Sequence, residues 1–135
     1  MKFVLFRHAH KGLMPFEDPE LSPRGFTQAA AILNLIQEKV LPPPTRLCVS
    51  PRRRTSQTLY PVSRALGLQM ETVPGLDQRE GTETSAEFRA RITSFVKDLR
   101  SAGESEIVYA CTHYDWIEES MGLIDCDRDL SSFEF

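Results

Sequence analysis

Two histidines in the sequence come directly after apolar segments. His8 follows Arg7 at the end of the segment 2–6, and His113 lies just beyond the segment 106–111. A neutral imidazole can attack phosphorus and carry the phosphoryl group until water releases it. The guanidinium of an arginine presents a planar set of donors that matches phosphate oxygens. These residue types indicate phosphoryl transfer, with His8 as the nucleophile, Arg7 holding an oxygen beside it and His113 as a further donor to the oxyanion.

A second group of candidates follows the apolar segment 46–50. Ser50 and Pro51 combine a good helix cap with a good first helical residue, so a helix is predicted to begin there. Arg54 would lie about one turn into that helix, from which its guanidinium could bind the same oxygens in a bidentate way. The positive end of the helix would also face the site. We therefore expect Arg54 in the catalytic group and Ser50 in contact with the substrate.

The elements that must position these residues alternate along the chain. Strands are predicted at 2–6, 46–50, 68–73 and 106–111, and helices at 22–40, 51–67 with a kink or break at Pro61, 84–99 and about 115–121, with a last edge strand around Phe133 and Phe135. Alternation of this kind predicts one α/β domain over residues 1–135, in three layers, with a mostly parallel central sheet and helices on both faces. The ligand site of such a sheet lies beyond the carboxyl ends of its strands, where Arg7, Ser50 and His113 all fall.

The composition restricts the class of partner and the compartment. The net charge of −3 gives no reason to expect nucleic acid or an anionic membrane as partner. No apolar run approaches the roughly 20 residues of a membrane helix, and the start of the chain lacks the pattern of a secretory signal. The cysteines Cys48, Cys111 and Cys126 show no metal spacing and form no even set for disulfides. A reducing cytoplasm is the expected location, and the sequence does not indicate an oligomeric state.

Four blocks of the sequence resemble motifs of one known family. FRHAHKG resembles its Arg-His-Gly signature, SPRRRTSQT its Ser-Pro-x-x-Arg-x-x-Gln-Thr block, ELSPRGFTQA the helix start between them, and ACTHYDW the strand that delivers its second histidine. The family is the histidine phosphatase superfamily, also called phosphoglycerate mutase-like, and the resemblance runs from Met1 to about Met121. It implies the phosphoglycerate mutase-like fold and a reaction without metal or cofactor. The site that it implies contains Arg7, His8, Arg54 and His113.

The sequence departs from the family pattern in three places. Ala9 stands where the family usually has glycine, which is tolerable if the local φ is negative. Gln78 stands where the family has its general-acid carboxylate, and none of Asp77, Glu80 and Asp115 matches that pattern. The chain also ends before the additional strand of its relatives, so a short C-terminal end is expected. We expect Gln78 to contact the substrate in place of the acid.

The absent acid and the compact chain together favour one class of substrate. An alkoxide leaving group needs a proton from a tuned acid, a contribution of roughly 10²–10⁴-fold. A phosphoramidate leaves as imidazole, which can be protonated beforehand. The chain also has no insertion long enough to cover the site, so a residue displayed on another protein could enter. Tyr114 and Trp116 would line the entrance, unless they pack in the core. These features are similar to those of the small bacterial phosphohistidine phosphatases. We therefore predict a metal-independent phosphatase that acts on phosphohistidine in a protein.

Other interpretations stay open at this stage. The site could instead hydrolyse small phosphate esters, such as sugar or metabolite phosphates, or it could bind phosphate without turnover. Cys48 and Arg54 match the Cys-x₅-Arg pattern of cysteine-dependent phosphatases, although Pro51 removes a backbone donor from the intervening loop. A metal site formed by His8, His10 and Asp18 is conceivable, but the spacing is not one that metal sites commonly use.

Overall fold

The central sheet of the computed structural model, which describes residues 1–123, consists of four parallel strands in the order β1-β4-β2-β3. The strands are β1 (Lys2–Arg7), β2 (Arg46–Val49), β3 (Met70–Thr72) and β4 (Ile107–Thr112). β4 lies in the middle, and its Tyr109 is in register with Val4 of β1 and Leu47 of β2. The first and last strands of the described chain are therefore direct neighbours, and their carboxyl ends meet.

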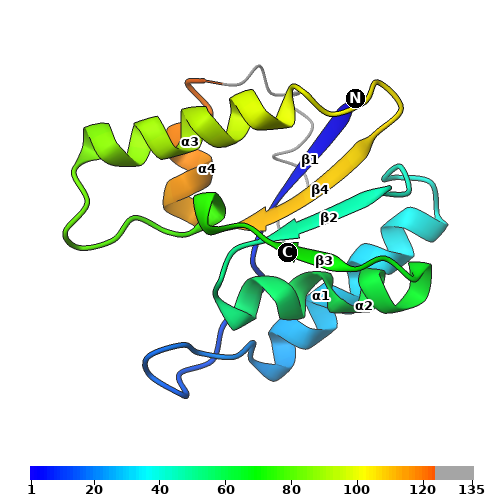
Figure 1. Cartoon of the computed structure of the whole chain (residues 1–135). Coiled ribbons are helices and arrows are strands. Elements are labelled where there is room, and N and C mark those ends of the chain that lie inside the picture. Colours follow the sequence, from blue (N-terminus) through cyan, green and yellow to red (C-terminus); the bar gives the residue numbers. More distant parts are fainter. Residues whose placement is uncertain (124–135) are drawn as a thin grey trace.

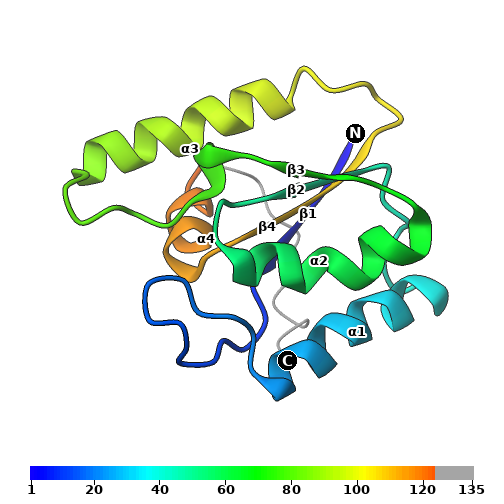
Figure 2. The same cartoon turned by 60° about the horizontal axis from the view of Figure 1, so that its bottom comes forward.

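Helices cover both faces of the sheet (Figures 1 and 2). They are α1 (Pro23–Gln37), α2 (Arg53–Leu66), α3 (Ser85–Leu99) and α4 (Tyr114–Ser120). The core between the sheet and α1 and α2 contains Val4, Phe6, Ile32, Leu41, Leu47, Val49, Leu59, Val62, Tyr109 and Cys111. The core under α3 and α4 contains Cys48, Leu76, Phe88, Ile92, Val96, Leu99, Val108, Ala110 and Trp116. Successive strand residues alternate between the two cores, as the period of a strand requires. The predicted three-layer α/β architecture is confirmed.

The helix boundaries follow capping signals in the sequence. The Ser22 side chain accepts a hydrogen bond from the backbone N–H of Gly25, and α1 begins at the following proline. Thr84 and Glu87 form the capping box that starts α3. α2 ends at Gly67, whose φ of 67° is the left-handed conformation that glycine adopts without strain.

Four local predictions were wrong. The second helix begins at Arg53 with Arg52 as its cap, because the Ser50 hydroxyl is hydrogen-bonded to a histidine instead. Pro61 lies inside a continuous α2, so the helix is not broken there; burial of the residues around it offsets the one helical hydrogen bond that proline removes. α1 ends at Gln37, three residues earlier than expected, and β3 has three residues where six were expected. A short 3₁₀ helix, η1 (Pro74–Leu76), follows β3. The expected edge strand at Phe133 and Phe135 lies outside the described residues.

Candidate active site

Three neighbouring strands deliver the candidate residues to one end of the sheet. His8 follows β1, Ser50 follows β2 and His113 follows β4, while Arg54 is the second residue of α2. The rings of His8 and His113 meet edge to face, with their centroids 5.4 Å apart. Arg54 Nη2 lies 3.4 Å from Nδ1 of His113 and 2.8 Å from Oε1 of Gln78. The structure thus brings together two histidines, an arginine and an amide, of which His8 and His113 are more than 100 residues apart in the sequence.

The imidazole of His8 is held in a neutral form with one ring nitrogen free. Its Nδ1 lies 2.7 Å from the carbonyl oxygen of Ala9. A carbonyl can only accept, so Nδ1 carries the proton and Nε2 keeps its lone pair for attack. Burial, followed by the charges of Arg54 and Arg7, lowers the pKa of His8 to about 4. At neutral pH the ring is therefore uncharged, as attack on phosphorus requires.

Ala9 fits the place where the resemblance leads one to expect glycine. Its backbone N–H donates to Oγ1 of Thr58 on α2, at 2.9 Å, and fixes the turn that carries His8. Among the non-glycine residues from 1 to 123, Lys39 alone has a positive φ. The methyl group of Ala9 therefore causes no backbone strain, and the sequence-based condition for tolerating it is met.

His113 is buried and is held from both sides of its ring. Arg54 can only donate, so Nδ1 of His113 accepts from it, and Nε2–H donates to Oγ of Ser50 at 2.8 Å. The Ser50 hydroxyl is 3.0 Å from Oγ1 of Thr55, which itself donates to backbone carbonyls. Burial and the charge of Arg54 lower the pKa of His113 to about 3. Direct donation to an oxyanion, as the sequence predicts, would require His113 to exchange one of these partners.

Arg54 is a buried guanidinium with unused hydrogen-bonding capacity. It is 4% exposed, and its Nε has no hydrogen-bond partner among the described residues. A carboxylate oxygen of Asp18 lies 3.9 Å from its Nη1. Burial and the neighbouring charge of Arg52 lower the pKa of Arg54 below its usual value, although an arginine remains charged. A buried charge with an orphan donor is stabilised by an anion in direct contact with it.

Arg7 and Tyr114 form the rim of the site. Arg7 is exposed, and its guanidinium carbon lies over the ring of Tyr114, 5.2 Å from the centroid. Tyr114 is itself 59% exposed. A cation over an aromatic face is held by the ring quadrupole, so Tyr114 restrains a side chain that would otherwise be free.

Comparison of the sequence with known families identifies the group to which these residues belong. The sequence model of the histidine phosphatase superfamily (branch 1) matches residues 4–80, which is more than half of the chain. The chain belongs to this superfamily. The match includes Arg7, His8, Arg54 and Gln78, whereas His113 lies beyond it. No curated protein matches the sequence significantly.

Solved structures of several phosphatases share the fold of the chain. Phosphoserine phosphatase from Entamoeba histolytica, in complex with phosphoserine, has a TM-score of 0.74 at 17% identity, over 98% of this chain and 85% of that one. Mycobacterial glucosyl-3-phosphoglycerate phosphatase Rv2419c with VO₃ has a TM-score of 0.72 at 19% identity, over 96% and 84%. The protein histidine phosphatase SixA with tungstate has a TM-score of 0.65 at 20% identity, over 87% and 72%. The fold is phosphoglycerate mutase-like, as predicted.

The carboxylates near the usual acid position of this superfamily are engaged elsewhere. Asp77 Oδ1 accepts from Nε of Arg52 at 3.1 Å and lies 3.7 Å from Nε2 of His113. Glu80 is 3.6 Å from Arg52, and Asp115 accepts from the backbone N–H of Arg79 at 3.0 Å. Asp77 is therefore the one of these three that reaches the histidine cluster.

Asp18 is a member of the site that sequence reasoning placed only in a tentative metal cluster. Its carboxylate accepts from the backbone N–H of Arg53 at the start of α2 and approaches Arg54. Its loop folds back onto α2, and no spacing rule could have shown this contact. In the part of the chain that the structure describes, no group of three or more His, Cys, Asp or Glu side chains could hold a metal ion.

Cys48 and His10 do not join the site. Cys48 is 1% exposed and packs under α3 and α4, whereas Arg54 belongs to a helix on the opposite face of the sheet. Burial raises the pKa of the Cys48 thiol to about 11, so it is not a thiolate nucleophile at neutral pH. His10 is exposed, and its Nδ1 is 2.7 Å from Oγ of Ser22.

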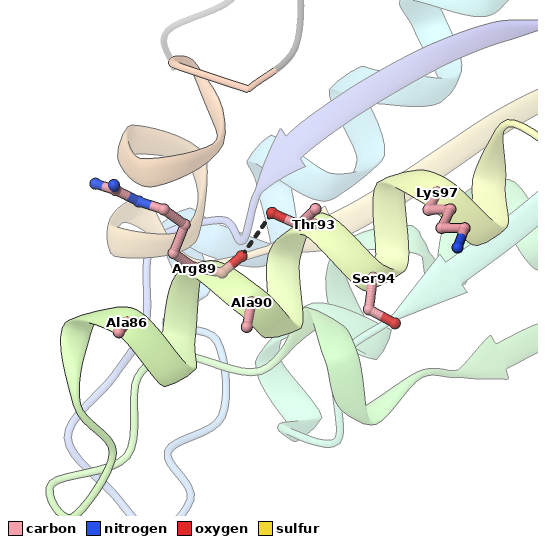
Figure 3. Close-up of a pocket in the computed structure, with 6 residues that line it drawn as sticks. All are labelled: Ala86, Arg89, Ala90, Thr93, Ser94 and Lys97. Atoms are coloured by element: carbon pink, nitrogen blue, oxygen red, sulfur yellow. Dashed lines mark hydrogen bonds between the residues drawn. The ribbon is translucent and has the colours of Figure 1, made fainter.

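A shallow hollow on the outer face of α3 is separate from this site. Figure 3 shows its lining, in which Thr93 donates a hydrogen bond to the carbonyl of Arg89. The residues of the hollow are Ala86, Arg89, Ala90, Thr93, Ser94 and Lys97, none of which contacts the histidine cluster. No helix within residues 1–123 is long and apolar enough to cross a membrane.

Proposed function

We propose that the chain is a phosphatase that forms a phosphohistidine intermediate on His8 and acts on phosphohistidine in a protein substrate. The lone pair on Nε2 of His8 attacks the phosphorus, and the bond from phosphorus to the substrate nitrogen breaks. The leaving imidazole keeps the proton that it took up beforehand from solvent. Water then attacks the phosphorus on His8, giving inorganic phosphate and the free imidazole.

The single observation that carries this proposal is the state of Arg54. A guanidinium that is 4% exposed, with an orphan Nε in the described part of the chain, is arranged for an oxyanion beside it. Arg7 at the rim supplies a second cation, and the start of α2 adds its backbone dipole. During transfer, the negative charge of a phosphoryl group spreads over its oxygens. Arg54, Arg7 and the start of α2 offer positive charge that is already in place to stabilise it. These groups are part of the protein, so we also propose that no metal is required.

The environment of Gln78 supports phosphohistidine as the substrate. Its amide accepts from Arg54 and has no acidic proton to give to an alkoxide. An imidazole leaving group has less need of such a proton. The buried free thiols of Cys48 and Cys111 are compatible with the reducing cytoplasm, where we place the protein.

One contact favours a second candidate, a phosphomonoesterase for small phosphate esters. Asp77 lies 3.7 Å from His113 and, released from Arg52, could supply the proton that an alcohol leaving group requires. The fold is shared by a phosphatase named for phosphoserine and by one named for protein histidine. The fold therefore does not distinguish the two leaving groups, and they must be tested directly.

A turnover panel tests the proposal. The chain is assayed on a phosphohistidine peptide, glucose 6-phosphate, 3-phosphoglycerate and p-nitrophenyl phosphate, with and without chelator. We expect hydrolysis of the phosphohistidine peptide to be fastest and the chelator to have no effect. Fastest turnover of a sugar phosphate would favour the second candidate. Phosphate binding without hydrolysis of any substrate would show a non-catalytic module.

A further inference from the structure

The loop between β1 and α1 exposes apolar side chains beside the candidate active site. Leu13 and Phe16 are each 85% exposed, and Met14 is 73% exposed. Single exposed apolar residues are common on protein surfaces, but three within four positions form a local patch. Figures 1 and 2 show this loop, in dark blue, extending away from the sheet and the helices.

The loop is held in place by hydrogen bonds near its base. The backbone N–H of Gly12 donates to the carbonyl of Glu20 at 2.7 Å, and Glu20 N–H donates to the carbonyl of Met14 at 3.3 Å. Asp18, two residues after Phe16, accepts from the backbone N–H of Arg53. The apolar patch is therefore a preformed surface that needs little ordering when it binds a partner.

The same hydrogen bonds connect the patch to the phosphate site. Asp18 also approaches Nη1 of Arg54, at 3.9 Å, so the loop is in contact with the residue that we assign to the phosphoryl oxygens. A phosphorylated side chain bound at Arg54 would bring the residues around it close to this loop. The patch thus belongs to the loop that contacts the candidate site through Asp18.

The charge of the loop indicates which partner would cover it. Residues 11–20 contain the acidic Glu17, Asp18 and Glu20 and one basic residue, Lys11. Asp18 and Glu20 are paired with Arg53, whereas Glu17, next to Phe16, is exposed. The carboxylate of Glu17 repels an anionic lipid surface. It attracts a partner that carries basic side chains near its apolar ones.

We propose that Leu13, Met14 and Phe16 form a docking surface for apolar residues that flank the phosphohistidine of a protein substrate, with basic residues nearby. This inference rests on the proposed function, because it assigns the substrate class of the same site. The patch would select among phosphoproteins without touching the reacting atoms.

Two phosphohistidine peptides of equal length test the docking surface. One has leucines on both sides of the phosphohistidine and the other has serines there, with the same lysines in both. For the native chain we expect kcat/KM to be about tenfold higher on the leucine peptide, which corresponds to about 1.4 kcal/mol. The double variant Leu13→Ser/Phe16→Ser should lose this preference while its kcat/KM for p-nitrophenyl phosphate stays unchanged. Val40→Ser, at a residue 50% exposed after α1, is the matched control and should keep the preference.

The other outcomes separate the two proposals. Turnover of both peptides at equal rates, or a preference that survives in the double variant, would overturn the docking surface and leave the proposed function intact. Absence of turnover on both peptides, with turnover of glucose 6-phosphate, would overturn both. Sedimentation with phosphatidylcholine–phosphatidylglycerol vesicles that is lost in the double variant would assign the patch to a membrane and refute a protein partner.

Discussion

Nη2 of Arg54 donates a hydrogen bond to Oε1 of Gln78, at a distance of 2.8 Å. An amide thus lies against the arginine that we propose to bind phosphate, where the family resemblance leads us to expect a carboxylic acid. We predict that kcat/KM for phosphohistidine and aryl phosphates exceeds that for alkyl phosphates by about 10² or more, because only alkoxide departure depends on the acid. Steady-state assays of the three substrate types measure the ratio. Equal rates on alkyl phosphates that Asp77→Asn abolishes would identify Asp77 as a relocated acid.

The nucleophile can be identified by two alanine variants. His8→Ala should abolish turnover and prevent a phosphoenzyme, because Nε2 of His8 is the attacking atom in the proposed mechanism. Cys48→Ala should retain most activity, since the Cys48 thiol is buried under α3 and α4, on the face of the sheet opposite the helix that carries Arg54. Trapping with radiolabelled substrate should give a phosphoenzyme that is acid-labile and alkali-stable, as an N-linked phosphate is. Loss of activity in folded Cys48→Ala would instead favour the thiol mechanism.

The two histidines of the site should make stability depend on pH. The pKa of His113 is about 3 in the folded chain and that of His8 about 4, against 6.5 for a free histidine. Between pH 6.5 and 4 the unfolded chain therefore binds protons that the folded chain does not, so stability falls as pH falls. For His113 the loss from pH 7 to pH 5 is on the order of 1–2 kcal/mol. Urea unfolding at several pH values should show a smaller slope for His113→Asn; an unchanged slope would contradict the prediction.

The ring of Tyr114 should matter through Arg7. Tyr114→Phe keeps an aromatic face under the guanidinium and should have nearly native kcat/KM. Tyr114→Ala removes it and should lower kcat/KM about two- to fivefold, the equivalent of about 0.5–1 kcal/mol for an exposed cation–π contact. In the background of Arg7→Ala the same change should have no further effect. An additive loss in the double variant would show that Tyr114 contacts the substrate directly.

Oxyanion binding should depend on arginine and be independent of metal. Vanadate should inhibit the native chain, and Arg54→Ala should weaken that inhibition at least tenfold, because the buried guanidinium is the main charge facing the oxyanion. EDTA should leave both activity and inhibition unchanged. Activity that disappears with EDTA and returns with a divalent cation would refute a metal-independent site. Circular dichroism of Arg54→Ala provides the check that the variant is folded.

Local signals were sufficient to predict the sheet and the strand-end residues. Alternation of apolar segments with capped helices indicated the parallel sheet, and the carboxyl-end rule then placed His8 and His113 at one site. Boundaries were less predictable, because Ser-Pro at Ser50 and Pro51 has the form of a helix start. The competing partner of Ser50, the ring of His113, lies 63 positions away in sequence and is visible only in the fold.

The contacts that sequence could not predict are those made by side chains across loops. Asp18 reaches the start of α2 because its loop folds back, and Arg7 contacts Tyr114 because α4 begins near the end of β1. The engagement of Asp77 with Arg52 is of the same kind. Such pairs depend on the positions of two separately placed backbones, for which neither periodicity nor spacing carries information.

The order of strands in the sheet also determines when the site can form during synthesis. Within the described chain, β1 is hydrogen-bonded only to β4, whose residues 107–112 are made about a hundred positions later. A ribosome-bound chain that has reached residue 100 already carries His8 and Arg54, yet β1 has no strand to pair with. Contacts of such long sequence separation also form slowly. The nascent protein is therefore expected to remain inactive until β4 emerges and pairs with β1.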